Sequence, residues 1–579
     1  MSIKTPPSEM RLALGELRPY FVRSAWFTLF SCLLVLMPSW YMLEVYDRVV
    51  NSRSTMTLFM LTILVMGAYV VMELLEWSRS ELMHQGGREL DKKMGKRVFN
   101  AIFHANLRRM PGGTMQPMND LRTVRDFLHS PVLVALMESP ISLIFLILIF
   151  FINPLLGWVT VVAATVQVFV GWLNERSTQP PLAQANRTAI AAQMYADGTL
   201  RNAQVIESMG MVRDIHRRWI DKQREFLGLQ ALASDQGGGY QAISKFMQNL
   251  VSSMLLGLSC WLLLHNQLNG GGGMLIISGI LGGRVLAPMV QIVAQWKGVV
   301  NVRDSLNRLE QLLANLPKKP ESMPLPAPKG FLLVESVVAG APGSPVAILK
   351  NVAFALNPGE VLAVVGPSAS GKTTLARLLV GAWPAVSGKV RLDGVDVFSW
   401  DKVELGPNMG YLPQGVELFE GTFAENIARF GDIDMSKVRT AAKAVGLHEY
   451  ILSMPQGYDS PVGSDGAILS GGQRQRVGLA RAIYGDPVFV VLDEPNSSLD
   501  DAGDAALAGA IAELKARGTT FVVMTHRTSV FGVADKILVL RDGQSAAFGP
   551  RDEVLAALNK ATNQAKTAGP QVSPSAATA

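Results

Sequence analysis

A glycine-rich stretch from Gly366 to Thr374 matches the spacing G-x-x-x-x-G-K-[ST] of a phosphate-binding loop. It follows an apolar run, Val361 to Val365, that predicts a β-strand, and it precedes a run, Leu375 to Val380, that predicts a helix. A strand-to-helix turn is the setting in which such a loop binds phosphate. The sequence therefore predicts a site for a nucleoside triphosphate.

Each residue type in this loop has a chemical use. Gly366 and Gly371 let the backbone turn its N–H groups inward, and the start of the following helix adds positive potential. Lys372 would reach the β- and γ-phosphates, and the Thr373 hydroxyl would ligate Mg²⁺. The predicted nucleotide-binding residues of the loop are Gly366, Pro367, Ser368, Ala369, Ser370, Gly371, Lys372, Thr373 and Thr374.

Two carboxylates stand at the end of another apolar run. Phe489 to Leu492 predicts a buried strand, and Asp493 and Glu494 follow it directly. This strand would place both carboxylates beside the phosphate loop, where Asp493 holds Mg²⁺ and Glu494 polarises the attacking water. The pair predicts hydrolysis of the nucleotide, with Glu494 and Lys372 as catalytic residues.

A second glycine-rich stretch, Leu469 to Gln473, precedes a run that predicts a helix, Arg474 to Tyr484. A serine hydroxyl and glycine N–H groups at a helix N-terminus form an anion site. Two phosphate sites would be redundant in a monomer, so we expect the second to close on the nucleotide of a neighbouring copy. Its predicted residues are Ser470, Gly471, Gly472 and Gln473.

The composition predicts a membrane part. The chain has 579 residues, of which 49% are hydrophobic, and its mean hydropathy of +0.24 is high for a soluble protein. Its net charge is +6, but the basic residues flank apolar runs and form no patch interleaved with aromatic residues, so no nucleic-acid partner is predicted. Cys32 and Cys260 lie in apolar runs and support neither a disulfide framework nor a zinc site.

Six stretches reach the length of about 20 apolar residues that a membrane span needs. They cover residues 24–45, 56–76, 132–152, 155–173, 246–265 and 273–293. Lys and Arg collect after the second and fourth spans, whereas the other connections hold only Arg48 and Arg53, so both termini are expected to be cytoplasmic. The two basic connections predict helices that extend past the membrane, with breaks at Pro111 to Gly113 and Ser208 to Met211.

Four segments follow from these features. Residues 1–300 are expected to form the six-span domain with long cytoplasmic helical extensions, and 301–329, with its proline-rich end, the linker. Residues 330–560 would form the nucleotide-binding domain, and 561–579 a disordered tail. The ionisable residues at or near span ends would be interfacial anchors or line a substrate path, and both interpretations remain open for Glu44, Glu73, Glu138 and Arg284.

Over roughly residues 330–555 the chain resembles the ATPase domain of ATP-binding-cassette (ABC) proteins. The Walker A, Q-loop, signature, Walker B, D-loop and switch-histidine elements are matched by Gly366 to Thr374, Gln414, Leu469 to Gln473, Asp493-Glu494, Ser497 to Asp500 and His526. The resemblance implies that Gln414 contacts Mg²⁺ and senses the γ-phosphate, that His526 is a catalytic contact to the γ-phosphate, and that Asp500 communicates across a dimer interface. One departure is Val338 to Pro342, which lacks the aromatic residue on which ABC domains usually stack adenine.

One six-span unit ahead of one ATPase domain resembles half of an ABC exporter. The expected fold is a six-helix α transmembrane domain of the ABC exporter type, followed by an α/β P-loop nucleotide-binding domain, in a homodimer. Within the membrane half, several segments are similar to those of type I secretion permeases of the protease/lipase exporter type, although Glu138 stands where Asp is expected. These segments are Met42 to Val49, Asp120 to Leu128, Arg201 to Ala203, Ser208 to Met211, Arg218-Trp219 and Gly283 to Pro288.

This resemblance implies an ATP-driven exporter of an unfolded polypeptide with a C-terminal signal, in the inner membrane of a Gram-negative bacterium. The implied cofactors are ATP and Mg²⁺. The implied partners are a second copy, a membrane-fusion (periplasmic adaptor) protein, an outer-membrane channel, the unfolded substrate and the lipid bilayer. The alternative is a lipid or drug exporter of the same architecture, whose turnover small amphiphiles would stimulate. Among functions without transport, the complete catalytic set with Glu494 disfavours a purely gating cassette, and the six spans disfavour a soluble DNA-repair ATPase.

Overall fold

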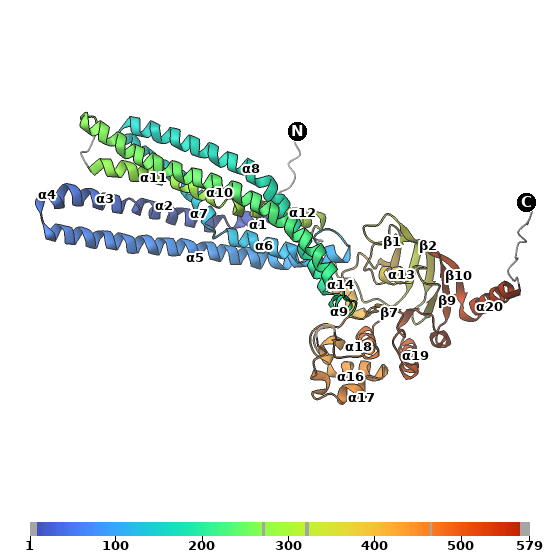
Figure 1. Cartoon of the computed structure of the whole chain (residues 1–579). Coiled ribbons are helices and arrows are strands. Elements are labelled where there is room, and N and C mark those ends of the chain that lie inside the picture. The colour runs from blue at the N-terminus through green and yellow to red at the C-terminus, as the bar shows by residue number, and fades with distance from the viewer. Residues whose placement is uncertain (1–7, 269–272, 319–322, 464–465, 568–579) are drawn as a thin grey trace, which may run out of the picture. The chain divides into compact units, whose positions relative to one another are not determined.

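The computed structural model describes residues 8–268, 273–318, 323–463 and 466–567 (Figure 1). The chain divides into two compact units. The first comprises Met1–Asn106 and Pro111–Lys318, and the second comprises Leu107–Met110 and Lys319–Ala579. Each unit has its own architecture: the first is built from helices, and the second combines two sheets with shorter helices.

The first unit contains six segments that are long and apolar enough to cross a membrane, which confirms the predicted number of spans for the described residues. The most apolar window of α5 is only 6% buried, so its apolar side chains face outward and suit a lipid or protein environment. The elements of this unit are α1 (Glu9–Glu16), α2 (Arg18–Leu34), α3 (Met37–Glu44), η1 (Val45–Val49), α4 (Val50–Ser52), α5 (Thr55–Leu107), α6 (Gln116–Phe127), α7 (Pro131–Ile152), α8 (Pro154–Leu200), α9 (Ala203–Ser208), α10 (Val212–Leu264), α11 (Gly273–Ala294) and α12 (Trp296–Asn315).

The connections between these helices follow from local residue types. Asn153 alone separates α7 from α8, and its Oδ1 accepts a hydrogen bond from the Leu155 N–H at 2.9 Å, which caps α8. Gly210 adopts a positive φ of 66° in the turn between α9 and α10, where a break was predicted. A further interruption, between Leu200 and Ala203, separates α8 from α9.

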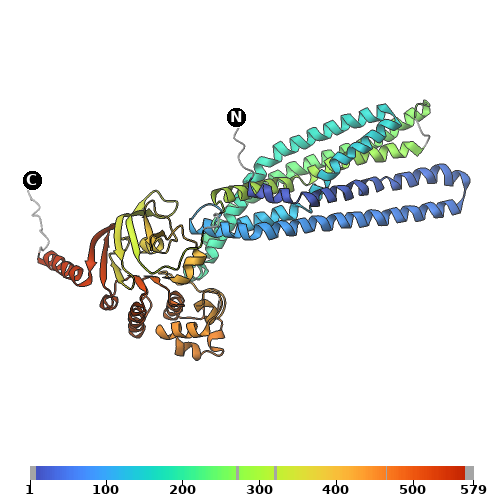
Figure 2. The same ribbon diagram turned by 180° about the vertical axis from the view of Figure 1, so that it is seen from behind.

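Four of the long helices form the packed part of the first unit. α8 lies beside α10, and α11 packs against both α10 and α7 (Figure 2). Their contact faces bury Phe145, Ile149, Leu156, Leu255 and Leu286. Polar pairs connect the first span to α5: the Ser31 hydroxyl donates to Glu76 at 3.1 Å, and the hydroxyls of Tyr41 and Thr62 lie 3.0 Å apart.

Two stretches expected to be irregular are helical. Residues 301–315 were predicted as linker but belong to α12, because Leu309, Leu312 and Leu313 recur at helical spacing and are buried. The helix is fixed to α6 through Asp120, which accepts hydrogen bonds from Ser305 at 3.0 Å and from Arg308 at 2.6 and 2.9 Å. Likewise α20 continues to Thr567, so residues 561–567 of the expected tail are helical, and residues 568–579 lie outside the described part.

The second unit alternates strands and helices after an initial antiparallel hairpin. Its elements are β1 (Leu332–Gly340), β2 (Ala347–Leu356), β3 (Val361–Val365), α13 (Lys372–Leu379), β4 (Ser387–Leu392), β5 (Val395–Asp396), α14 (Lys402–Leu405), η2 (Gly406–Asn408), β6 (Met409–Leu412), α15 (Phe423–Ile427), α16 (Met435–Ala444), α17 (His448–Leu452), η3 (Gly457–Asp459), α18 (Gly471–Ile483), β7 (Phe489–Asp493), α19 (Asp501–Ala516), β8 (Thr520–Met524), η5 (Thr528–Gly532), β9 (Lys536–Arg541), β10 (Gln544–Pro550) and α20 (Arg551–Thr567).

Two sheets organise this unit. The smaller sheet is antiparallel with strand order β2-β1-β4-β5, and the larger has the order β10-β9-β3-β8-β7-β6. In the larger sheet, β9, β3, β8, β7 and β6 run parallel, and β10 pairs antiparallel with β9. The strands β7 and β8 are buried along their whole length, which explains their continuous apolar runs. Loops after parallel strands meet at one edge of a sheet, and the residues predicted to do chemistry lie in those loops.

Candidate active site

Four loops at the carboxyl edge of the larger sheet carry the predicted catalytic residues. Lys372 comes after β3, His526 after β8 and Gln414 after β6. Asp493 is the last residue of β7, and Glu494 comes directly after it. These strands are neighbours in the order β3-β8-β7-β6, so residues far apart in sequence are brought to one place. Although β8 lies between β3 and β7, Asp493 is close enough to the phosphate loop for the Thr373 hydroxyl and Lys372 to act on its pKa.

The phosphate loop uses two left-handed residues to turn back on itself. Gly371 has a φ of 102°, which strains any other residue, and a Cβ added there would stand 2.6 Å from Leu349 Cδ2, so glycine is favoured. Ala369 has a φ of 65°, a conformation that costs an L-residue on the order of 1 kcal/mol. The helix α13 then begins at Lys372 rather than at Leu375, so the loop residues Lys372 and Thr373 form its first turn.

The lysine side chain is held inside this loop. Its Nζ donates to the carbonyl oxygens of Gly366 at 2.8 Å and Pro367 at 3.2 Å. Burial lowers the pKa of Lys372, while the nearby carboxylates of Glu494 and Asp493 act in the opposite direction. The ammonium therefore lies between the loop and the acidic end of β7. A bound phosphate would replace the two carbonyl oxygens as the acceptor of its hydrogen bonds.

Asp493 is a buried carboxylate whose charge is stabilised by few protein groups. The residue is 1% exposed, and neither oxygen has a hydrogen-bond partner at full bonding distance among the described residues. Burial raises the pKa of Asp493, and the Thr373 hydroxyl beside it acts in the opposite direction. A buried, unpaired carboxylate is costly, so this position suits a cation ligand.

Glu494 lies between two other predicted residues. Its Oε2 accepts a hydrogen bond from Gln414 Nε2 at 3.0 Å, and its Oε1 lies 3.3 Å from His526 Nε2. Its backbone has a positive φ of 50°, and its N–H donates to the Met524 carbonyl of β8 at 2.9 Å. A strained backbone held by a neighbouring strand fixes the direction of this carboxylate.

The second glycine-rich stretch forms the start of α18. Ser470 is the N-cap: its hydroxyl accepts from the Gln473 N–H at 3.2 Å, and the Gln473 side chain accepts from the Ser470 N–H at 2.8 Å. Gly471 and Gly472 form the first turn, and a Cβ at Gly472 would stand 2.8 Å from the Ser498 carbonyl oxygen. The predicted anion site is therefore a capped helix N-terminus on a helix of 13 residues.

Sequence reasoning missed Gln475, which connects this helix to the catalytic loop. The residue is buried, and its side-chain Nε2 donates to the Glu494 carbonyl at 3.0 Å while its Oε1 accepts from the Ser498 N–H at 2.8 Å. The next residue, Arg476, pairs with Asp500 at 2.5 Å, and Asp500 also caps α19 through the Gly503 N–H. In the sequence Gln475 stands between Arg474 and Arg476, and its helical spacing with Leu479 and Ile483 was the only signal.

The site can be tested for its fit to Mg²⁺. Mg²⁺ prefers oxygen ligands and keeps several positions for phosphate and water. Thr373 and Asp493 supply such oxygens next to the phosphate loop, and the unpaired carboxylate of Asp493 has the charge to compensate the ion. Gln414, also predicted as a ligand, donates to Glu494 instead, so it would have to turn to reach the ion.

Two family models match this chain in the same order as its two units. The model described as ABC transporter transmembrane region matches residues 24–285, and the model described as ABC transporter matches residues 349–497. The second match contains the phosphate loop, Gln414, the signature stretch and both carboxylates.

Individual relatives cover nearly the whole chain. The type I secretion system ATP-binding protein PrsD of Rhizobium meliloti (strain 1021) is 37% identical over 545 residues, which are 94% of this chain and 93% of PrsD. The toxin RTX-I translocation ATP-binding protein of Actinobacillus pleuropneumoniae is 27% identical over 560 residues, which are 94% of this chain and 77% of that protein.

A solved structure shows the same fold. The structure of a bacterial Atm1-family ABC exporter with ATP bound has a TM-score of 0.82 and 22% identity to this chain, and it covers 96% of this chain and 99% of the exporter chain. The expected fold, six spans followed by an α/β nucleotide-binding domain, is confirmed. The chain therefore belongs to the ABC transporter family, among the ATP-binding proteins of type I secretion, as a multi-pass membrane protein whose ATPase activity is coupled to transport.

Proposed function

We propose that this chain is the inner-membrane ABC component of a type I secretion system and exports an unfolded, protease- or lipase-like polypeptide with a C-terminal signal. The observation that carries this proposal is the 37% identity to PrsD along almost the full length of both chains. The membrane half contributes to it as well, because the segments that resemble secretion permeases lie in that half.

The active form in this proposal is a homodimer. The anion site at the start of α18 belongs to the same unit as the phosphate loop, and a monomer has no use for both with one nucleotide. Ser470, Gly471, Gly472 and Gln473 of one copy would contact the nucleotide held by the loop of the other. Asp500, paired with Arg476 beside the signature helix, would report closure across the interface.

The catalytic roles follow from the positions of the side chains. Lys372 and the backbone N–H groups of the loop would hold the phosphates of ATP, and Thr373, Asp493 and Gln414 would hold Mg²⁺. Mg²⁺ would neutralise charge on the β- and γ-phosphates. Glu494 would accept the proton of the attacking water, and His526, already beside its carboxylate at 3.3 Å, would contact the γ-phosphate.

The location follows from the spans and the basic residues. The six spans would cross the inner membrane with both termini in the cytoplasm, because Lys and Arg collect in the connections that would face this compartment. A membrane-fusion protein and an outer-membrane channel would receive the polypeptide on the other side. No nucleic acid takes part.

The proposal can be tested by secretion from a Gram-negative host that lacks its own type I exporter. The chain is expressed with a membrane-fusion protein, an outer-membrane channel and a secreted protease, either complete or without its C-terminal segment. We expect the complete protease in the medium only when all three envelope components are present. Glu494→Gln in the exporter should abolish this secretion.

Two outcomes would contradict the proposal. One is secretion that is equally efficient without the C-terminal segment, which would remove the signal from the proposal. The other is ATP turnover that an unfolded polypeptide does not change but a small amphiphile stimulates, which would favour a lipid or drug exporter.

A further inference from the structure

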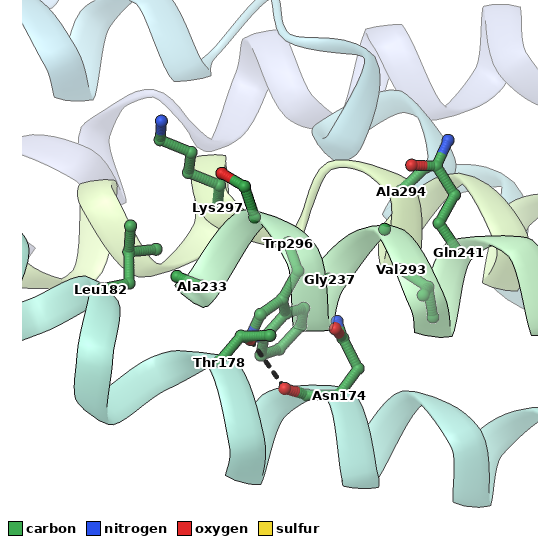
Figure 3. Close-up of a pocket in the computed structure, with 12 residues that line it drawn as sticks. Asn174, Thr178, Leu182, Ala233, Gly237, Gln241, Val293, Ala294, Trp296 and Lys297 are labelled. Atoms are coloured by element: carbon green, nitrogen blue, oxygen red, sulfur yellow. Dashed lines mark hydrogen bonds between the residues drawn. The ribbon is translucent and has the colours of Figure 1, made fainter. Parts of the chain in front are cut away.

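A pocket of about 220 Å³ lies between four helices of the first unit (Figure 3). α8 contributes Asn174 and Thr178, α10 contributes Gly237 and Gly238, and the junction of α11 with α12 contributes Val293 and Trp296. The lining contains no Asp or Glu. Its volume is suited to a small group rather than to a whole lipid or drug molecule.

The pocket contains polar atoms whose hydrogen-bonding capacity is unused. Asn174 is 1% exposed, and neither its Nδ2 nor its Oδ1 has a partner within the described part of the chain. The buried Trp296 Nε1 also lacks one there. The Thr178 hydroxyl does not serve the carboxamide, because it donates to the backbone carbonyl of Asn174 at 2.7 Å. In Figure 3 the Asn174 side chain reaches from α8 toward Gly237 on α10.

Unpaired buried polar groups require an explanation, since their burial costs free energy unless a partner is supplied. The carboxamide offers both a donor and an acceptor, and the indole offers a further donor. The matching ligand is a group that presents C=O and N–H side by side. Because a trans peptide unit points its C=O and N–H in opposite directions, the match is the N–H and C=O of one extended main-chain residue, which point to the same side.

On the opposite wall, α10 lines the pocket with Gly237 and Gly238, flanked by Ala233, Ser234 and Gln241. Gly237, Gly238 and Gly239 follow one another inside α10, although glycine in a helix interior is destabilising relative to alanine. Packing does not demand them: a Cβ at Gly238 or Gly239 would meet nothing within 4 Å, and a Cβ at Gly237 would be 3.8 Å from Thr178 Cγ2. Glycine at a pocket wall lets another backbone approach closely.

The pocket also lies where a polypeptide would arrive. Asn174 comes directly after the predicted fourth span, Gly237 precedes the fifth, and Trp296 follows the sixth. In the proposed orientation this level is the cytoplasmic margin of the membrane. Lys297 also lines the pocket, but Figure 3 shows its ammonium directed away from Asn174, so the carboxamide site is neutral.

We propose that this pocket binds the main-chain N–H and C=O of one extended residue of the unfolded polypeptide as it enters the exporter. The inference rests on the proposed function and adds a place at which substrate is recognised independently of its side chains. Recognition of the backbone would suit an exporter that must handle every residue type of a long chain.

A matched pair of glycine variants tests the pocket. Gly238→Leu and Gly239→Leu both replace glycine with a strong helix former at a position with open space, but only residue 238 lines the pocket. The full chain in nanodiscs is titrated with a carboxymethylated, permanently unfolded polypeptide, and the stimulation of ATPase activity is measured. We expect the half-saturating concentration to rise on the order of tenfold in Gly238→Leu, the size of one or two lost hydrogen bonds. Gly239→Leu should match the wild type.

A second pair separates binding from stability. Asn174→Leu removes the unpaired carboxamide, so it should raise the thermal unfolding midpoint while it weakens the response to polypeptide by a similar factor. Asn186→Leu is the control: Asn186 lies on the same helix, and its Nδ2 donates to Asn301 Oδ1 at 3.0 Å. The control should lower the unfolding midpoint and leave the polypeptide response unchanged.

The outcomes distinguish this inference from the proposed function. If both glycine variants respond like the wild type, or if both lose the response equally, the pocket is not the site, although polypeptide export stands. If Asn174→Leu gains stability with no change in the polypeptide response, the pocket holds water only, and the inference is overturned. If the wild-type chain does not respond to polypeptide at all but responds to a short-chain phospholipid, both the inference and the proposed function fail.

Discussion

The side-chain amide of Gln414 donates a hydrogen bond to the carboxylate of Glu494 at 3.0 Å. Gln414 follows β6 and Glu494 follows β7, so the contact joins neighbouring strands at the carboxyl edge of the sheet. His526 stands 3.3 Å from the other carboxylate oxygen. A carboxylate has about four acceptor sites, so Glu494 can still accept a proton from water, and the proposed turn of Gln414 toward Mg²⁺ would free a further site.

The first prediction concerns Glu494 itself. Glu494→Gln keeps the shape of the side chain but removes its ability to accept a proton. ATP turnover should fall by a factor of about 10² to 10⁴, the range for a lost general base, while ATP binding persists. Phosphate release and nucleotide affinity measured on the same preparation check both statements.

The control for this variant is Glu513→Gln. Glu513 lies on α19, is largely exposed, and pairs with Arg517 at 2.5 Å, so its loss should leave turnover unchanged. Hydrolysis at the wild-type rate in Glu494→Gln would refute its role as the base.

The second prediction concerns Gln475, the buried link between the signature helix and the D-loop. Gln475→Leu would leave the Ser498 N–H without its partner, at a cost of about 1–3 kcal/mol for a buried group. It would also remove one of two donors to the Glu494 carbonyl, which keeps the Ser497 N–H at 3.2 Å. We expect kcat for ATP to fall on the order of tenfold because the backbone that carries Glu494 is no longer held.

A conservative variant separates this role from general destabilisation. Gln475→Glu keeps the acceptor for the Ser498 N–H but replaces the amide donor to the Glu494 carbonyl with a second acceptor. ATP turnover in Gln475→Glu should be lower than in the wild type even if the two proteins have the same unfolding midpoint. Equal turnover in all three proteins would show that the link is dispensable.

The third prediction concerns backbone strain in the phosphate loop. Ala369 holds a φ of 65°, where an L-residue is strained and glycine is not. Ala369→Gly should therefore stabilise the second unit by about 1 kcal/mol, measured as a higher thermal unfolding midpoint. Ala376→Gly is the matched control, because Ala376 is buried inside α13 and the same substitution there should destabilise by about 1 kcal/mol. Destabilisation by both variants would contradict the assignment of strain.

The fourth prediction is a dependence of stability on pH. Burial of Glu360 acts to raise its pKa, but the ion pair with Lys536 at 2.7 Å and hydrogen bonds from Asn357 outweigh it, so the pKa of Glu360 is lowered below its usual 4.5. A lowered folded pKa means that the stabilisation is present above about pH 4.5 and is lost as the pH falls through the folded value. Unfolding midpoints of the full chain between pH 3 and 7 measure this loss.

Substitution of either member of the Glu360–Lys536 pair should have the same effect on stability. Glu360→Gln removes the titrating group, and Lys536→Met removes its partner, so each should flatten the pH dependence and lower the stability near neutral pH by about 1–2 kcal/mol. If both variants kept the wild-type dependence of the unfolding midpoint on pH, other groups would be responsible for the loss of stability in acid.

Much of this protein could be predicted from local patterns. The six spans were predictable because the thickness of the bilayer requires long apolar helices, and hydropathy reports this length directly. The phosphate loop was predictable because its glycines, Lys372 and Thr373 stand at fixed spacing between a strand and a helix. By contrast, the prediction of a linker was wrong at residues 301–315. The prolines after Leu316 are typical of a linker, and they were given more weight than the leucines at helical spacing that precede them.

The sequence by itself determined which residues could bind phosphate, hold a cation and accept a proton, since each capacity belongs to a residue type and its immediate neighbours. Only the tertiary structure decided that Gln414, Glu494 and His526 meet, that Gln475 joins the signature helix to the catalytic loop, and that Asn174 faces the glycines of α10. The physical reason is that strand order and helix packing are set by contacts between distant segments, and no local pattern records which of them become neighbours.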